Sequence, residues 1–389
     1  MLRMKRLIST ALLAIGLSFI LTSCWDRREI NDYAFVQASS IDKAKDGIQV
    51  SVLIPLPGNM GSTGGGGNVG GQKPFVIKTD TGRDVIEAVN KLQSRLPRRL
   101  FFAHRRVLIV GEEVARNGLA PGMDSVTRLP ENRLTAFIAV TKGSALDLLN
   151  SDTRLERFSA ESMRESLQSD LSLRVTLKDV ISESNVIGSD AMLPYLQKIT
   201  TKIKGHESDE IAVVGYALTH NGKMISVAKD EAMFGIRILS HRFRPYQETF
   251  SDGNNFITVR INKEELKIKP IMKEGKLRYR ITAKMSISVN EDTNLERNYD
   301  DIGQRRHIEK LVEEKMTREI NKAITLMQSS NCDVIGFGQY AYRAYPQAWN
   351  KEWKDQWDTL FPASKFDINV RVTLNRIGMS RENLAKKAE

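Results

Sequence analysis

The sequence predicts a multi-domain protein of mixed α/β and α+β class that begins with an export signal. Apolar residues alternate at period two in several short runs and recur every three or four residues in others, which indicates strands and helices respectively. The 41% hydrophobic and 27% charged residues are typical of a soluble globular body. Because 389 residues exceed what one core normally holds, we expect two or three domains.

The N-terminus predicts a lipid-anchored exported protein. Three early cations precede an apolar run from residue 7 to 21, which is shorter than the roughly 20 residues that span a bilayer. The run ends in Leu21-Thr22-Ser23-Cys24, which resembles the bacterial lipobox. We therefore expect residues 1–23 to be a lipoprotein signal peptide and Cys24 to carry a diacylglycerol. The alternative is an ordinary signal, or an uncleaved anchor, with a chance cysteine.

The net charge and the cysteine content limit which binding partners and which disulfide bonds we expect. The formal net charge of +11 would raise the question of nucleic acid, but export argues against it. We expect anionic lipid or an anionic cell-wall polymer to neutralise these positive charges. The alternative is that the basic residues are simply spread over solvent-exposed faces. Cys332 is the second of two cysteines, so lipidation of Cys24 leaves it without an internal disulfide partner. We expect Cys332 to be a small buried apolar residue rather than a nucleophile.

The first half of the chain alternates strand-like and helix-like runs. Strand signatures occur at residues 48–54, 74–79, 100–111 and 133–143. Helical signatures occur at residues 84–96, 112–119 and 144–150, the last with Ser144 as a plausible cap. We expect an N-terminal α/β region over residues 24–205, with a helical segment at 144–200.

A glycine-rich stretch at residues 58–72 interrupts this pattern. It resembles a phosphate-binding loop only superficially, because Gln72 separates Gly71 from Lys73 and Pro74 stands where a hydroxyl belongs. We interpret the stretch as a flexible loop.

The second half reads as antiparallel sheet packed by helix. His220-Asn221-Gly222-Lys223 joins two alternating runs, which is a strong hairpin signal. Apolar residues recur at three and four residues over 302–327, which predicts the longest helix; a second covers about 346–360, and a final strand begins near 365. We expect a small middle β-rich domain at 206–262 and a C-terminal α+β domain at 263–389.

Several residue groups could carry function. One group is an aromatic stripe in which tryptophan recurs every four residues, formed by Trp349, Trp353 and Trp357 with the nearby Tyr345. This stripe is either part of the hydrophobic core or an exposed ridge that binds a partner. Arginines cluster at residues 95–106, and basic residues again at 263–280, as a solvated face or a docking site. "GFGQYA" at residues 336–341 matches a dinucleotide fingerprint, but it follows a predicted helix, so we interpret its glycines as turn residues.

No pattern points to catalysis. The five histidines lack His or Cys neighbours at metal-ligand spacing, and no Gly-x-Ser-x-Gly elbow is present. Glu112 and Glu113 are adjacent on a predicted helix, so their side chains should point apart. We expect no enzyme activity and no cofactor. An anchored wall-modifying enzyme remains a rival and would need converging carboxylates or a metal site.

The order of four segments resembles the Ger(x)C family, the lipoprotein C subunit of nutrient germinant receptors in endospore-forming bacteria. The segments are the lipobox with "CWDRREINDYAFVQASSID", "RVLIVGEEVARNGL", "VVGYALTHNGKMISV" and "DVIGFGQYAYRAYPQAWNKEW". The glycine-rich loop looks like a local insertion.

This resemblance implies a fold of three mixed α/β domains on the outer face of the inner spore membrane. It implies polytopic A and B subunits as partners in one receptor complex, with Cys24 as the functional position and no catalytic motif. A solute-binding lipoprotein feeding a transporter is the alternative, and it would predict two similar lobes.

Overall fold

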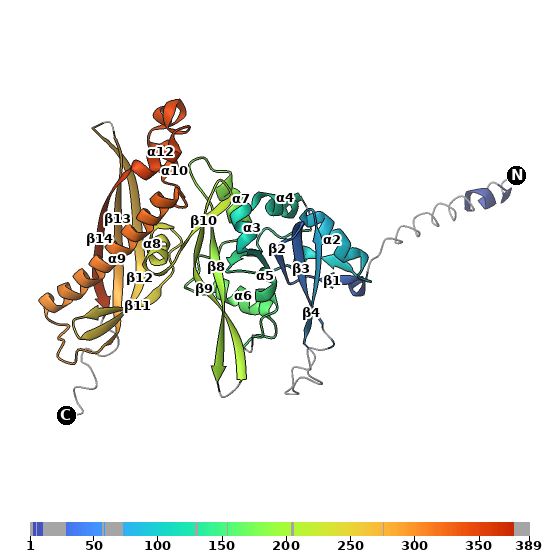
Figure 1. Ribbon diagram of the computed structural model, residues 1–389, viewed down its shortest axis with the longest axis horizontal. Helices are drawn as coiled ribbons and strands as arrows, with labels where there is room; N and C mark the ends of the chain where they lie inside the picture. The colour runs from blue at the N-terminus through green and yellow to red at the C-terminus, as the bar shows by residue number, and fades with distance from the viewer. Residues whose placement is uncertain are drawn as a thin grey trace.

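Figure 1 shows a computed structural model of the protein. The structure describes residues 3–4, 6–10, 29–56, 58, 73–128, 131–153, 155–203, 206–274 and 276–376. Its described part is built on a large N-terminal sheet and a smaller C-terminal sheet, which lie side by side along the long axis of the molecule.

In the described residues, the N-terminal sheet has eight strands. They are β2 (Ala38–Ala44), β3 (Gly47–Pro55), β4 (Phe75–Gly82), β6 (Val107–Gly111), β7 (Phe137–Thr141), β8 (Met192–Ile203), β9 (His206–His220) and β10 (Lys223–Ala228). Across the sheet they run in the order β10-β9-β8-β7-β6-β2-β3-β4. The central strands β2, β6, β7 and β8 pair in parallel, and the remaining pairs are antiparallel.

Helices cover both faces of this sheet and bury two separate groups of apolar side chains. One face carries α2 (Val85–Ser94), α3 (Glu112–Asn117), α4 (Ala120–Arg128) and α7 (Leu177–Ser184). The other carries α5 (Ala145–Leu149) and α6 (Ser159–Gln168). Local signals fix the helix ends: Ser144 caps α5 as predicted, and Gly118 ends α3 at a φ of +138° that favours glycine.

A two-stranded parallel sheet forms the outer edge of the N-terminal region. It pairs β1 (Tyr33–Phe35) with β5 (Arg99–Phe101). Single turns flank it, η1 (Ile30–Asp32) before β1 and η3 (Phe102–His104) after β5. In Figure 1 this sheet lies on the side of the molecule away from the C-terminal sheet.

The C-terminal sheet, as far as the structure describes it, has four strands, β11 (Tyr246–Asp252), β12 (Asn255–Lys273), β13 (Lys276–Asp292) and β14 (Lys365–Arg376), in that order. Its helices are α8 (Asp230–Leu239), α9 (Ile302–Ser330), α10 (Phe337–Ala344), α11 (Pro346–Ala348), the π-helical turn η4 (Trp349–Trp353) and α12 (Trp357–Ala363).

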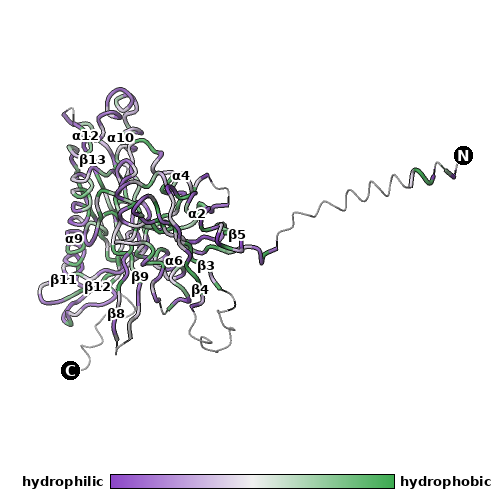
Figure 2. Tube along the Cα trace, turned by 45° about the vertical axis from the view of Figure 1, so that its right-hand side comes forward, coloured by the Kyte–Doolittle hydropathy of each residue, from purple (hydrophilic) through white to green (hydrophobic). Residues whose placement is uncertain are grey.

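Helices α8 and α9 connect the two sheets. A Cβ added at Gly235 of α8 would lie 2.0 Å from the carbonyl oxygen of Glu319 of α9, so the two backbones touch. Helix α9 also packs on β14 and contacts β10 of the other sheet. Figure 2 shows hydrophobic segments in the interior, whereas the outer turns of α9 are hydrophilic. One continuous apolar core therefore extends from β3 to β14.

The structure confirms the mixed fold class and several elements. The hairpin at Asn221-Gly222 joins β9 to β10, and both turn residues have positive φ, 51° and 73°. The long helix predicted at 302–327 is α9. The second helix predicted at 346–360 is instead interrupted by η4, and the strand predicted at 100–111 is split by η3.

Three expectations need correction. The helical segment predicted at 144–200 ends earlier, because Met192–Ile203 forms strand β8. The C-terminal sheet is mixed rather than antiparallel, since β14 runs parallel to β13; the long connection through α9 permits this crossover. The region 206–262 has no sheet of its own, because β9 and β10 join the N-terminal sheet and β11 the C-terminal one. The domain boundary expected between residues 205 and 206 therefore falls between two strands, β8 and β9, that are hydrogen-bonded to each other.

Candidate functional sites at the sheet junction and near the N-terminus

The predicted lipidation site, Cys24, and the glycine-rich stretch except Gly58 lie outside the described residues. The lipid anchor therefore stays a prediction. The next described residue after Cys24 is Glu29, which precedes η1. Within the described ranges, no helix combines the length and the apolarity that crossing a bilayer takes.

The tryptophan stripe belongs to the interior. Trp349, Trp353 and Trp357 are only 1%, 8% and 8% exposed. The rings of Trp349 and Trp357 are 5.1 Å apart, and the half-buried Tyr345 packs edge-on against Trp353. The π-helical turn η4 divides the segment, and all three indoles pack inside this chain. The structure thus contradicts an exposed tryptophan ridge and agrees with the alternative that the stripe is core.

A buried carboxylate organises this aromatic cluster. Asp333 is 2% exposed and lies in the turn before α10. Its oxygens accept hydrogen bonds from the amides of Phe337 and Gly338, both at 2.8 Å, and from the Trp357 indole at 3.2 Å. Burial raises the pKa of Asp333 to about 7, although these donors partly offset the effect.

The same turn is bound to the N-terminal sheet through Asp190, in the loop before β8. The amide of Asp333 donates to Oδ2 of Asp190 at 2.9 Å, and the amide of Asp190 donates to the carbonyl of Asp333 at 2.9 Å. The hairpin turn adds His220, whose Nδ1 lies 3.2 Å from Asp190, and the amide of Asn221, at 3.3 Å. This junction joins β8, the β9–β10 turn and α10.

Close glycine packing completes the junction. A Cβ at Gly188 would lie 2.6 Å from Cη2 of Trp349, and one at Gly338 would lie 2.7 Å from the backbone of Gly188. Gly336 caps α10 at a φ of +76°. The glycines of the "GFGQYA" segment therefore serve a turn and a close approach of two chain segments.

Two of the segments that carried the family resemblance meet here: the strand–turn segment with His220 and the segment from Asp333 to Trp353. Asp190 was not singled out by the sequence, since its partner lies 143 residues away. What the junction can do is hold the two sheets in one fixed arrangement.

The other candidate residues are also engaged in packing. Glu112 accepts a hydrogen bond from the Tyr195 hydroxyl at 2.7 Å and pairs with Arg116, whereas Glu113 is exposed, so the two carboxylates point apart as predicted. Cys332 is fully buried, as predicted, and burial raises its pKa to about 12. Among the described residues, no group of His, Cys, Asp and Glu is arranged to bind a metal.

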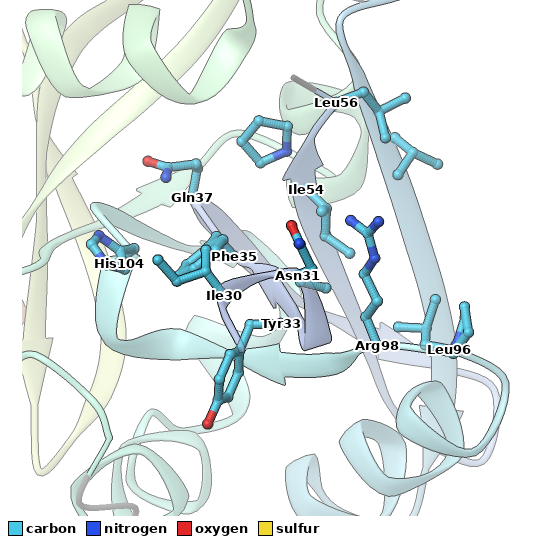
Figure 3. A pocket seen from close by; sticks show the side chains of 14 residues that line it. Ile30, Asn31, Tyr33, Phe35, Gln37, Ile54, Leu56, Leu96, Arg98 and His104 are labelled. Atoms are coloured by element: carbon cyan, nitrogen blue, oxygen red, sulfur yellow. The ribbon is translucent and has the colours of Figure 1, made fainter. Parts of the chain in front are cut away.

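A pocket of about 660 Å³ opens beside η1 and β1. Its wall is largely apolar, and Figure 3 shows Ile54, Leu56 and Leu96 on one side of it, with Phe35 and His104 on the other. Arg98 extends its guanidinium along the side that Ile54 lines. The sequence did not reveal this pocket, because its wall comes from five separate segments.

Comparison with known proteins identifies the fold and the family. The family model described as spore germination protein N-terminal domain matches residues 26–198, and the one described as spore germination B3/GerAC like, C-terminal, matches residues 214–378. The solved crystal structure of the GerBC protein superposes with a TM-score of 0.52 at 17% identity, covering 90% of this chain and 99% of that one. This similarity supports the mixed α+β fold.

Full-length relatives occur in Bacillus subtilis (strain 168). The chain is 34% identical to the putative spore germination protein YfkR, over 97% of this chain and 98% of the relative. It is 25% identical to spore germination protein KC, over 97% of each, and 22% identical to spore germination protein B3, over 90% of this chain and 94% of the relative. The chain therefore belongs to the GerAC-like family of spore germination proteins, the family of germinant receptor C subunits.

Proposed function

We propose that this protein is a non-enzymatic C subunit of a nutrient germinant receptor. A diacylglycerol on Cys24 holds it on the outer face of the inner spore membrane. From there it contacts the polytopic A and B subunits and stabilises an assembly that responds to the nutrient. It uses no cofactor and binds no nucleic acid.

The observation that carries this proposal is the joint occurrence of the lipobox-like sequence and the matched family regions. Cys24 lies two residues before the first matched residue, Asp26, so a lipid there would hold the family's folded body directly at the bilayer. Two acyl chains suffice for stable anchoring, at ~0.8 kcal/mol per buried CH₂, whereas one chain holds a protein only reversibly.

Tethering gives the protein its effect through concentration. Confining the body to the membrane plane raises its effective concentration near membrane partners without any new contact. The junction at Asp190 and Asp333 supports the same mechanism, since it fixes both sheets in one arrangement. Partner surfaces on the two sheets would then be presented together.

In the part of the chain that the structure describes, the sheets do not form the two similar lobes expected of a solute-binding lipoprotein. Within the described residues, the two larger sheets differ in strand number and order, eight strands against four. Of the two adjacent carboxylates considered for catalysis, Glu112 is engaged by Tyr195 and Arg116, and the buried Asp333 at the junction is engaged by backbone amides. Both observations favour a contact role.

The second cysteine provides a matched control for the test. In spores, Cys24→Ala should yield a folded protein that leaves the membrane fraction and no longer supports the response to nutrient. Cys332→Ala, which removes the buried thiol, should remain membrane-bound and support germination. Fusing the Cys24→Ala body to an unrelated transmembrane anchor should restore the response. Normal germination of Cys24→Ala spores at normal protein abundance would refute the tethering role.

A further inference from the structure

The pocket beside the N-terminus has the composition of a site for an amphiphile. Its volume of about 660 Å³ lies within the range of roughly 300–1,000 Å³ of small-molecule sites. Apolar side chains from four segments line it, among them Ile54 and Leu56 of the β3 end, Val76 of β4 and Leu96 before β5. Such a wall suits a hydrocarbon chain.

Among the described residues that line this wall, Arg98 is the one arginine. Its two neighbouring arginines are already paired. Arg95 pairs with Asp80, and Arg99 pairs with Glu131 at 2.7 Å. Within the described chain, Arg98 has no carboxylate within ion-pair distance, and it is the arginine of this cluster that lines the pocket. An exposed guanidinium beside an apolar wall favours a ligand with an anionic head and an apolar tail.

The position of the pocket relates it to the membrane. Its wall includes Ile30, six residues after Cys24, so the chain can separate the two by at most roughly 20 Å. Ile30 is 77% exposed, which leaves a large apolar side chain in solvent at the pocket edge. If Cys24 is anchored, this end of the molecule lies at the bilayer surface.

We propose that the pocket binds an acyl chain of an anionic phospholipid of the bilayer, with the lipid phosphate at Arg98. This inference rests on the proposed tethering. The occupant is a bilayer lipid rather than the acyl group on Cys24, because withdrawing one of that group's two chains into the pocket would leave only one, which anchors marginally. The membrane thereby orients the protein as well as retaining it.

Photocrosslinking in nanodiscs tests the proposal with the full-length lipoprotein purified from membranes. Nanodiscs would contain phosphatidylglycerol with a photoactivatable acyl chain, and mass spectrometry would map the adducts. We expect adducts on the peptides that contain Ile54, Leu56 and Leu96. Leu96→Asp should abolish them. Arg98→Ala should reduce them about fivefold relative to the wild type, the effect of one cation near an anionic surface.

Arg99→Ala is the matched control, since it removes the same charge from a residue outside the pocket and should leave the adducts unchanged. Photoactivatable phosphatidylcholine should label the pocket less and should not respond to Arg98→Ala. Adducts spread evenly over the surface would overturn the proposal. So would adducts that arise only when the photoreactive group is incorporated into the acyl chains on Cys24. The mass of the N-terminal peptide shows separately whether residue 24 carries its lipid, so that loss of anchoring and an empty pocket remain distinguishable.

Discussion

The close approach of α10 to the loop before β8 makes a sharp prediction for Gly338→Ala. A Cβ at this position would lie 2.7 Å from Cα and O of Gly188 and 2.9 Å from Cη2 of Trp349. Real Cβ contacts are not this short, so backbone or a buried indole must shift. Fitting an extra methyl group into a packed interior costs about 1–3 kcal/mol.

An opposing effect comes from helix propensity. Gly338 is the second residue of α10, and alanine is favoured over glycine in helices by about 1 kcal/mol. The net expectation is that Gly338→Ala lowers the free energy of unfolding by up to about 2 kcal/mol. Gly303→Ala is a matched control, because Gly303 is the second residue of α9 and its added Cβ meets only one side-chain atom, an oxygen of the capping residue Asp301 at 3.0 Å, and no backbone of another element. Because helix propensity acts on this variant without a large packing cost, Gly303→Ala should raise the free energy of unfolding by up to about 1 kcal/mol.

Tryptophan fluorescence during urea unfolding is the appropriate assay. The chain has four tryptophans, and Trp349, Trp353 and Trp357 lie in the cluster at the junction, so emission reports on this site. A chain with two sheets can unfold in more than one step, so the midpoint of the fluorescence transition is the quantity to compare. A midpoint for Gly338→Ala equal to or above that of Gly303→Ala would refute the close packing of Gly188, Gly338 and Trp349.

Two further predictions concern buried ionisable groups. Burial, followed by the charge of Glu248, raises the pKa of the fully buried Glu319 to about 9, although Lys315 lowers it. The folded state therefore favours the protonated form of Glu319. The contribution of this proton to the free energy of unfolding is complete below pH 4.5, the ordinary pKa of the side chain, and is lost as the pH rises through 9. The loss is at most roughly 1.4 kcal/mol per pH unit. Glu319→Gln cannot ionise, so urea midpoints should match those of the wild type at pH 5 and exceed them at pH 9; parallel profiles would contradict this. Separately, the Cys332 thiol, whose pKa burial raises to about 12, should react with iodoacetamide at pH 8 far more slowly in the native lipoprotein than in urea, and equal rates would contradict its burial.

Elements with strong local signals could be predicted from the sequence. Asn221-Gly222 specified the β9–β10 hairpin, because both residues adopt the positive φ that a tight hairpin turn needs. The apolar stripe of α9 was equally informative, and Ile308, Val312 and Met316 are all fully buried. In these cases the pattern and the structure depend on residues within a few positions of one another.

Features that depend on distant contacts could not be predicted. Strand β8 was expected to be helical, although Pro194 disfavours a helix interior and the β-branched run Ile199-Thr200-Thr201 favours a strand. The tryptophan spacing was compatible with either a buried core stripe or an exposed ridge. Trp349 is buried because it packs against Gly188, which lies 161 positions earlier in the chain. The bond between Asp190 and Asp333 leaves no local pattern at all.

The strand order has a practical consequence for dividing the protein. The first matched family region ends at residue 198, inside β8, and the second begins at residue 214, inside β9. A fragment cut between them would expose a long unpaired strand edge on each piece, which invites aggregation. A chimaera between relatives should therefore exchange segments at residues 229–230, after β10, where no sheet hydrogen bonds are severed.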